Sequence, residues 1–344
     1  MQYFNELEAT INDMVHKGRG ILAADESAPT IAKRFDAIST PSTEQSRREW
    51  RSLLVNTPRL GEYISGLILF EETLDQDTIK ESNEAHEKIP QTTWAQEIVP
   101  GIKVDKGKIQ LALSPGDLIT QGLDGLEERL RNYKLQGARF AKWREVYAIN
   151  KHVPTKHGIE ANAEMLARYA AVCQAEGMVP IVEPEVLMDG EHTIQRHAEV
   201  TEAVQQAVFS ALYRHNVVLE LMILKPNMIL PGKDTRRAEP EEVAQATLKV
   251  LRRTVPAAVP SINFLSGGQS PEEATENLNA INQFADNAPW LLSISYGRAL
   301  QQTALHAWQG KSQNIKQAQQ ALLKRARLNH LAMLGEYQPK MELE

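Results

Sequence analysis

Eight short apolar runs, each followed by a polar or glycine-rich stop and a long amphipathic segment, limit what this chain can fold into. The runs lack the alternation of half-exposed strands, and this is typical of strands that are buried on both faces of a parallel sheet. We therefore expect one strand from each run. They are "GILAAD" (20–25), "ISGLILF" (64–70), "IVPGIKV" (98–104), "ARFAKW" (138–143), "MVPIVEPE" (178–185), "LELMILK" (219–225), "VPSINFLS" (259–266) and "WLLSISY" (290–296).

The segments between the runs have the caps and the periodicity of amphipathic helices. They cover 44–57, 125–136, 159–176, 193–215, 239–253 and 272–284, and the segments 299–308 and 312–334 follow the last run. This alternation predicts an α/β fold, a single (β/α)8 barrel. A doubly wound open sheet is the alternative. It normally has fewer strands, and no glycine fingerprint follows the first run.

The ends of the chain predict additions to this barrel. Its 344 residues suit one barrel with insertions, or two ordinary domains. We expect residues 1–17 to form an extra helix before the barrel, and residues 311–344 to form a final helix and a tail. Residues 1–344 would then be one TIM-barrel domain.

Composition narrows the class of protein. A content of 42% hydrophobic and 24% charged residues fits a globular protein with a sizeable core, and the net charge of −6 argues against a nucleic-acid partner. Cys173 is the one cysteine, so a reducing compartment is expected. The first residues predict neither a secretory signal nor a transit peptide. No apolar run reaches about 18 residues. We expect a cytoplasmic protein with no membrane partner.

Polar residues stand at the end of every apolar run. In a barrel of parallel strands the active site lies at the carboxyl ends of the strands. Lysines and carboxylates recur at these ends more often than loops in solvent would explain. The residues are Asp25, Glu71, Lys103, Lys142, Arg144, Glu183, Glu185, Lys225, Ser266, Gly267, Gly268, Ser295, Gly297 and Arg298.

Side chains two positions apart on a strand point the same way, so Lys142 and Arg144 should share one face of their strand, and Glu183 and Glu185 one face of theirs. A lysine near another cation and partly desolvated loses proton affinity, and a neutral lysine attacks carbonyls to form a Schiff base. Lys225 and Lys142 are both candidates for this role, and the more apolar run before Lys225 favours it. The alternative is that Lys225 extends to solvent at the rim, with the carboxylates as ion-pair partners.

The last two runs predict a phosphate site. "LSGGQS" and "SYGRAL" follow the seventh and eighth runs, where barrel enzymes often bind phosphate with loops and a helix N-terminus. Glycines let backbone N–H groups approach the oxygens, and Arg298 adds a charged fork. Lys103, Arg144 and the Lys33–Arg34 pair could hold a second anion, or could be ordinary surface charge.

No metal site is expected, because the nine histidines avoid the strand ends and a zinc enzyme on this barrel would need histidines at the rim. Cys173 falls at helical spacing among apolar residues and is expected in the core. Residues alone thus indicate a barrel enzyme that acts on a small phosphorylated compound, with imine chemistry.

Several motifs resemble those of class I fructose-bisphosphate aldolases. They are "GILAADES", "GIKVDKG", "TQGLDGL", "FAKWR", "MVPIVEPEV", "LKPNM", "FLSGGQS" and "SYGRAL", and they occur in the family's order from about residue 18 to about residue 335. The resemblance implies reversible cleavage of fructose 1,6-bisphosphate to dihydroxyacetone phosphate and glyceraldehyde 3-phosphate, in glycolysis or gluconeogenesis. It also implies a lyase without a metal cofactor, and a homotetramer.

Roles follow from the same resemblance. Lys225 would be the Schiff-base lysine, Lys142 would assist carbinolamine formation, and Glu183, supported by Glu185, would expel water. Asp25 would handle the proton of the C4 hydroxyl. The remaining residues would bind phosphate: Ser266, Gly267, Gly268, Ser295, Gly297 and Arg298 on the ketone half, Lys103, Arg144 and Lys33 on the other half, and Thr30 at the place of a family serine.

Two departures and two alternatives accompany the resemblance. Vertebrate members end in a tyrosine that assists proton transfer, whereas this chain ends "GEYQPKMELE" with Tyr337 upstream. Thr30 follows a changed pair, Ala28 and Pro29. Preference for another ketose, such as sedoheptulose 1,7-bisphosphate, is one alternative. A non-catalytic scaffold is the other. In such a protein the motif lysines and carboxylates would be free to change, whereas in this chain the motif positions of Lys225, Glu183 and Asp25 are filled as the activity requires.

Overall fold

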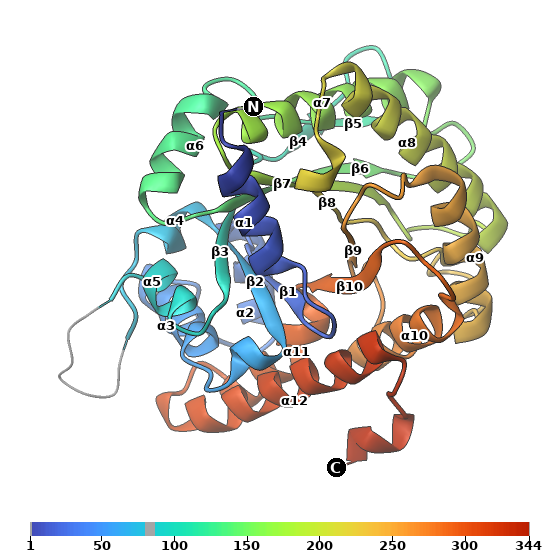
Figure 1. The fold of residues 1–344 in the computed structure, drawn as a ribbon. Helices are drawn as coiled ribbons and strands as arrows, with labels where there is room; N and C mark the ends of the chain where they lie inside the picture. Colours follow the sequence, from blue (N-terminus) through green and yellow to red (C-terminus); the bar gives the residue numbers. More distant parts are fainter. Residues whose placement is uncertain (1, 80–86, 344) are drawn as a thin grey trace.

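The central feature of the computed structural model, which describes residues 2–79 and 87–343, is a closed barrel of parallel strands (Figure 1). Neighbouring strands follow the chain order, and Ile21 opposite Ser295 closes the barrel between β1 and β10. Each predicted run contains one strand, so the (β/α)8 prediction is confirmed. The strands are β1 (Gly20–Ala24), β2 (Ile64–Leu69), β3 (Val99–Lys103), β6 (Phe140–Tyr147), β7 (Val179–Val186), β8 (Ile223–Leu224), β9 (Ser261–Phe264) and β10 (Leu291–Tyr296).

Helices surround the barrel, and each predicted helical segment contains one of them. Side-chain caps start several; the Thr155 hydroxyl, for example, accepts from Gly158 N at the start of α7. The helices are α1 (Phe4–Met14), α2 (Ala28–Asp36), α3 (Glu44–Val55), α4 (Glu71–Leu74), α5 (Ile89–Trp94), α6 (Leu126–Leu135), α7 (Lys156–Ala175), α8 (Ile194–Arg214), α9 (Pro240–Thr254), α10 (Pro271–Phe284), α11 (Arg298–Trp308) and α12 (Ile315–Leu334).

The run 219–225 differs from the expected strand. Its first half is a 3-10 helix, η2 (Leu219–Leu221), and only Ile223–Leu224 form β8. Leu221 is turned instead toward α1, with which it shares a buried cluster. Lys225 nevertheless continues the ladder, because its N–H donates to the carbonyl of Val182 at 2.8 Å.

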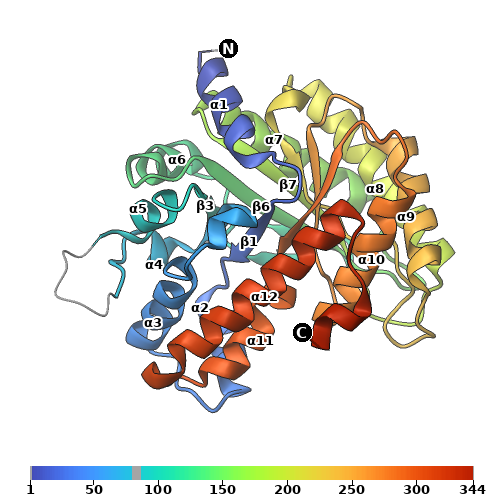
Figure 2. The ribbon, with the colours of Figure 1, turned by 60° about the horizontal axis from the view of Figure 1, so that its bottom comes forward.

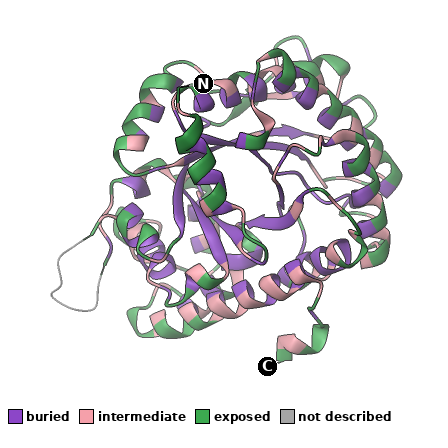
Figure 3. Cartoon of the chain, viewed as in Figure 1, coloured by how far each residue is buried: buried purple, intermediate pink, exposed green. Residues whose placement is uncertain are grey.

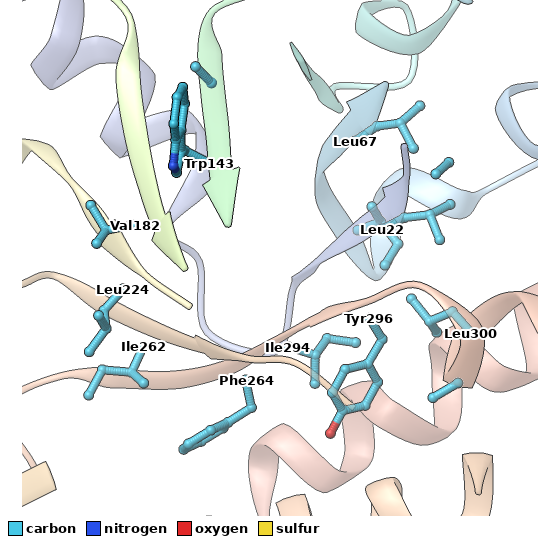
Figure 4. Packing of buried hydrophobic residues seen from close by; sticks show 14 of the residues in the cluster. Leu22, Leu67, Trp143, Val182, Leu224, Ile262, Phe264, Ile294, Tyr296 and Leu300 are labelled. Carbon is cyan, nitrogen blue, oxygen red and sulfur yellow. The ribbon is translucent and has the colours of Figure 1, made fainter. Parts of the chain in front are cut away.

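Two apolar layers hold the barrel together. The strands of the barrel are buried (Figure 3), and their outward-facing side chains, including Trp143, Phe264 and Tyr296, belong to a buried apolar cluster that continues into the helices (Figure 4). Cys173 lies in this layer and is buried, as predicted. A second cluster fills the barrel itself with Ile21, Phe140, Val179, Ile181 and Ile223.

Helix α1 covers the amino-terminal end of the barrel (Figure 1). Its residues Leu7, Ile11 and Met14 belong to the same buried cluster as the interior strand residues. The predicted helix before the barrel is therefore present, over Phe4–Met14. Apolar groups of α1 therefore cover this end of the barrel, and the charged residues that end the predicted runs lie toward the opposite end.

A small antiparallel hairpin, β4 (Lys108–Gln110) with β5 (Leu118–Thr120), was not predicted from the sequence. It lies between β3 and α6 in the chain and outside the barrel sheet. Its strands have three residues each, in a polar stretch, so no apolar run marks them.

The end of the chain packs along the outside of the barrel. Helix α12 lies against α10 and α11, and η4 (Pro339–Leu343) returns along α10 (Figure 2). Tyr337 is 3% exposed, and its hydroxyl donates to Glu342 Oε1 at 3.0 Å. Among the described residues, the recorded hydrogen bonds of Tyr337 join it to Glu342 and Asn279, not to any residue at the strand ends.

Candidate active site

Four charged side chains meet inside the barrel: Lys142 on β6, Glu183 on β7 and Lys225 just after β8 are buried, and Asp25 just after β1 is partly buried. Lys142 Nζ lies 2.7 Å from Asp25 Oδ2 and 3.5 Å from Glu183 Oε2. Lys225 Nζ lies 3.3 Å from the other oxygen of Glu183. The structure thus brings together four of the five residues expected to be catalytic. We call Asp25, Lys142, Glu183 and Lys225 the lysine–carboxylate ring.

The position of the ring follows from strand parity. Along β1 and β7 the inward positions are apolar near α1 and charged at the other end: Ile21 and Ala23 precede Asp25, and Val179 and Ile181 precede Glu183. Lys225 is only 4% exposed. Burial of these charges is tolerable because each finds an opposite charge.

The two lysines of the ring differ in their electrostatic setting. Burial opposes the charge of Lys142, but Asp25 and Glu183 outweigh it and hold the pKa of this lysine above its ordinary value. Burial likewise would raise the pKa of Asp25, yet Lys142 and Lys225 keep that pKa well below its usual range. Lys142 is thus a fixed cation, and Asp25 is an ionised carboxylate that can accept a proton.

A second group of charges lies beside the ring. Arg144 binds Glu185, the fifth residue expected to be catalytic, through a short ion pair. On β3, Lys103 Nζ lies 2.7 Å from Asp105 Oδ1 and stands in register with Lys142. Lys142 contacts Glu183 and Arg144 contacts Glu185, both on β7, in agreement with the expectation that Lys142 and Arg144 share a face of β6. Asp105 was not singled out from the sequence, although it follows Lys103 by two positions.

The loop after β9 passes beside Glu185. A Cβ at Gly267 would lie 3.6 Å from Glu185 Oε1, and Gly268 has a positive φ of 79°, which favours glycine. Ser266 is buried at the start of this loop. Ser266, Gly267 and Gly268, all expected to bind phosphate, therefore lie near the end of the barrel where the carboxyl ends of the strands meet, which we call the barrel mouth.

The end of β10 forms the neighbouring part of the mouth. The Ser295 hydroxyl is buried, and among the described residues it has no hydrogen-bond partner. Gly297 caps α11, whose first residue is the exposed Arg298. Arg34 of α2 approaches here, with Nη2 3.7 Å from the position of a Cβ at Gly297.

Helix α2 also carries Thr30 and Lys33. Both are exposed, and the Thr30 hydroxyl lies 3.1 Å from that of Ser27. Since the next residue, Arg34, approaches Gly297, α2 lies toward the β10 side of the mouth. The grouping of Lys33 with Arg144 stays a prediction.

A buried polar network supports Arg34, and it was not predicted from the sequence. Glu26 accepts a hydrogen bond from Arg34 and, at 2.9 Å, one from Gln301 Nε2, and it forms an ion pair with Arg51. Trp50 Nε1 in turn donates to Gln301 Oε1 at 3.2 Å. Trp143, next to Lys142 in the chain, does not line the site, because its ring faces outward and stacks on Tyr169.

Comparisons with known proteins agree over the whole chain. The family model described as "Fructose-bisphosphate aldolase class-I" matches residues 6–344. The chain belongs to the class I fructose-bisphosphate aldolase family. Members of this family are lyases, so the predicted enzyme class is confirmed.

Individual aldolases are similar at about half of all positions. A cytoplasmic isozyme 2 of fructose-bisphosphate aldolase from Pisum sativum is 51% identical over 337 residues, 98% of this chain and 92% of its own. A probable class 1 aldolase from Xylella fastidiosa is 51% identical over 334 residues, with coverage of 96% and 98%. The aldolase of Plasmodium falciparum, solved in complex with TRAP and a small-molecule inhibitor, aligns at a TM-score of 0.93 with 49% identity, covering 97% of this chain and 95% of that one.

Within residues 2–79 and 87–343, no cluster of three or more histidine, cysteine, aspartate or glutamate side chains has the arrangement of a metal site. Over the same ranges no helix is both long and apolar enough to cross a membrane.

Proposed function

We propose that Lys225 forms the Schiff base through which this aldolase cleaves fructose 1,6-bisphosphate reversibly to dihydroxyacetone phosphate and glyceraldehyde 3-phosphate. The observation that carries this choice is the shared carboxylate of Glu183. Lys142 has two carboxylate partners and is held charged. Lys225 contacts only the carboxylate of Glu183, which it shares with Lys142, and it lies at the end of an apolar strand. It is therefore the better nucleophile.

The ring residues would then divide the proton transfers. Glu183 takes a proton from Lys225 Nζ, 3.3 Å away, and the free amine adds to the C2 carbonyl. One proton then moves from the nitrogen to the oxygen, and Glu183 returns its proton to this hydroxyl, which leaves as water. Glu185 supports this step through Arg144. Asp25 takes the proton of the C4 hydroxyl, the C3–C4 bond breaks, and its electron pair moves into the protonated imine to leave an enamine. Lys142 keeps Asp25 ionised for this step.

Phosphate contacts form the next part of the proposal. For the ketone half we propose Ser266, Gly267, Gly268, Ser295, Gly297 and Arg298, with Thr30 nearby. The unpartnered, buried hydroxyl of Ser295 supports this, because a buried polar group without a partner is costly. For the other half we propose Lys103, Arg144 and Lys33.

The wider setting is also proposed. We infer a cytoplasmic enzyme, supported by relatives named as cytoplasmic isozymes, that is independent of metal and assembles as a homotetramer, as the family resemblance implies. Light scattering on the purified protein measures the mass of the assembly, and a dimer or monomer would contradict the tetramer. Residues 1–344 are proposed to act as one domain.

Incubation with dihydroxyacetone phosphate followed by borohydride, and peptide mass spectrometry, tests the imine. We expect label on Lys225, unchanged by a chelator. Label on Lys142 instead would reverse the roles of the two lysines. An active protein that takes no label would rule out the Schiff base, and an inactive one would favour a scaffold.

Sedoheptulose 1,7-bisphosphate is a second candidate substrate. The ring residues act on the carbonyl and hydroxyl groups that the two ketoses share, so they do not separate them. A comparison of kcat/KM for the two bisphosphates decides which is preferred.

A further inference from the structure

Lys108 on the β4–β5 hairpin is directed toward β6. It is paired with Thr120 across the hairpin, and directly opposite residues of an antiparallel pair lie on the same face. The Thr120 hydroxyl donates to the carbonyl of Arg144 at 2.8 Å. The face of the hairpin that carries Lys108 is therefore the face that contacts β6 at Arg144.

The charges around Lys108 belong to the second group described beside the ring. Lys108 is exposed. Desolvation of its ammonium by the groups around it, followed by the nearby guanidinium of Arg144, lowers the pKa of Lys108, while Glu185 and Asp189 act in the opposite sense. Lys108 is thus within electrostatic reach of Arg144 and Glu185.

Charge balance gives Lys108 its significance. Lys103 is paired with Asp105, Arg144 with Glu185, and Lys233 with Asp189. These three pairs are neutral overall, and Lys33, the other cation proposed for this phosphate, is carried by α2, which lies toward the β10 side of the mouth. Lys106, two residues earlier, is also paired, with Glu71 at 2.7 Å. Over residues 2–79 and 87–343, no ion pair is recorded for Lys108, so it adds the missing positive charge to this group.

The hairpin is held firmly enough to place this charge. Thr120 N donates to Glu145 Oε2 at 3.1 Å, and Asn162 Nδ2 of α7 donates to the carbonyl of Leu118 at 2.9 Å. Asp117, at the base of β5, accepts from the hydroxyl of Ser114 at 2.8 Å. These contacts hold β5, which pairs with β4. Binding of an anion then has to order the exposed side chain of Lys108 but not the backbone that carries it.

We propose that Lys108 is a further phosphate-binding residue, at the Arg144 end of the site, and that it gives the enzyme its preference for bisphosphates over monophosphates. This rests on the proposed function, which assigns Lys103 and Arg144 to the second phosphate. A ketose that carries only the first phosphate would not engage Lys108.

Steady-state kinetics on the full chain with fructose 1,6-bisphosphate and fructose 1-phosphate tests this role. In Lys108→Gln we expect the KM for the bisphosphate to rise about tenfold, as for loss of one charge-assisted hydrogen bond. The kcat and KM for fructose 1-phosphate should stay unchanged, which also shows that the variant is folded. Lys108→Arg should restore most of the bisphosphate affinity.

Lys106→Gln is the matched control, because Lys106 is an exposed lysine of the same segment that already has a partner. Equal effects of Lys106→Gln and Lys108→Gln would overturn the proposal, as would an unchanged bisphosphate KM in Lys108→Gln. If the wild-type protein cleaves neither ketose, the proposed function itself fails. An active wild type with a neutral Lys108→Gln removes the role of Lys108 alone.

Discussion

At the barrel mouth, the ionisation of a side chain depends on the charged groups beside it as well as on the residue type. Lys142 and Lys225 are both buried lysines, yet only Lys142 has a carboxylate on each side. Asp25 stays ionised because two ammonium groups face it. The same carboxylate without them would be protonated more easily.

Glu145 shows the opposite case on the outer face of β6. Its side chain is buried and accepts from Trp143 Nε1 at 2.8 Å and from Thr120 N at 3.1 Å. No cation is recorded among its contacts within the described residues. Burial therefore dominates and raises the pKa of Glu145 to about 7.

Glu145 should make stability depend on pH. Its folded pKa exceeds the usual 4.5, so between pH 4.5 and about 7 the folded state keeps a proton that the unfolded state has lost. The free energy of unfolding should fall as pH rises through this window, by about 3 kcal/mol for this group. We expect Glu145→Gln to lack this component.

Urea unfolding of wild type and Glu145→Gln at pH 5 and pH 8 measures the effect. Other titrating groups cancel in the difference between the two proteins. A difference that is the same at both pH values would contradict the raised pKa.

Among the elements, α1 has a structural role separate from the site. Leu7 is fully buried in the cluster at the amino-terminal end of the barrel. Leu7→Ala should lower the free energy of unfolding by about 2–5 kcal/mol, as for other buried leucines, with kcat unchanged. Glu8→Ala on the exposed side of α1 is the control. A loss of kcat in folded Leu7→Ala would show that α1 also shapes the catalytic end.

The elements also show how far sequence reasoning reaches. Strands buried on both faces give continuous apolar runs, so all eight were found, and parity then put Lys142 and Glu183 on inner faces correctly. The β4–β5 hairpin was missed because its stability comes from hydrogen bonds to Glu145 and Asn162, which lie far away in the sequence. Lys108 was missed with it.

The whole molecule is joined by the pairing of β1 with β10, which links the first and last strands. Because the sheet is closed, loss of any strand would leave two others without a neighbour. We therefore expect the barrel to unfold as one unit. Two variants, with Trp143 or Trp308 as the one remaining tryptophan, report on opposite parts of the barrel. Their urea midpoints should coincide. Separate midpoints would contradict a single domain.

Closure of one end of the barrel by α1 has a consequence for the order in which the products leave. Both products of the cleavage must leave through the opposite end of the barrel. In the proposed mechanism the ketone piece stays covalently attached to Lys225 until water releases it. The aldehyde piece has no covalent bond to the chain, so we expect it to leave first, and in the reverse direction we expect the ketone piece to bind before the aldehyde.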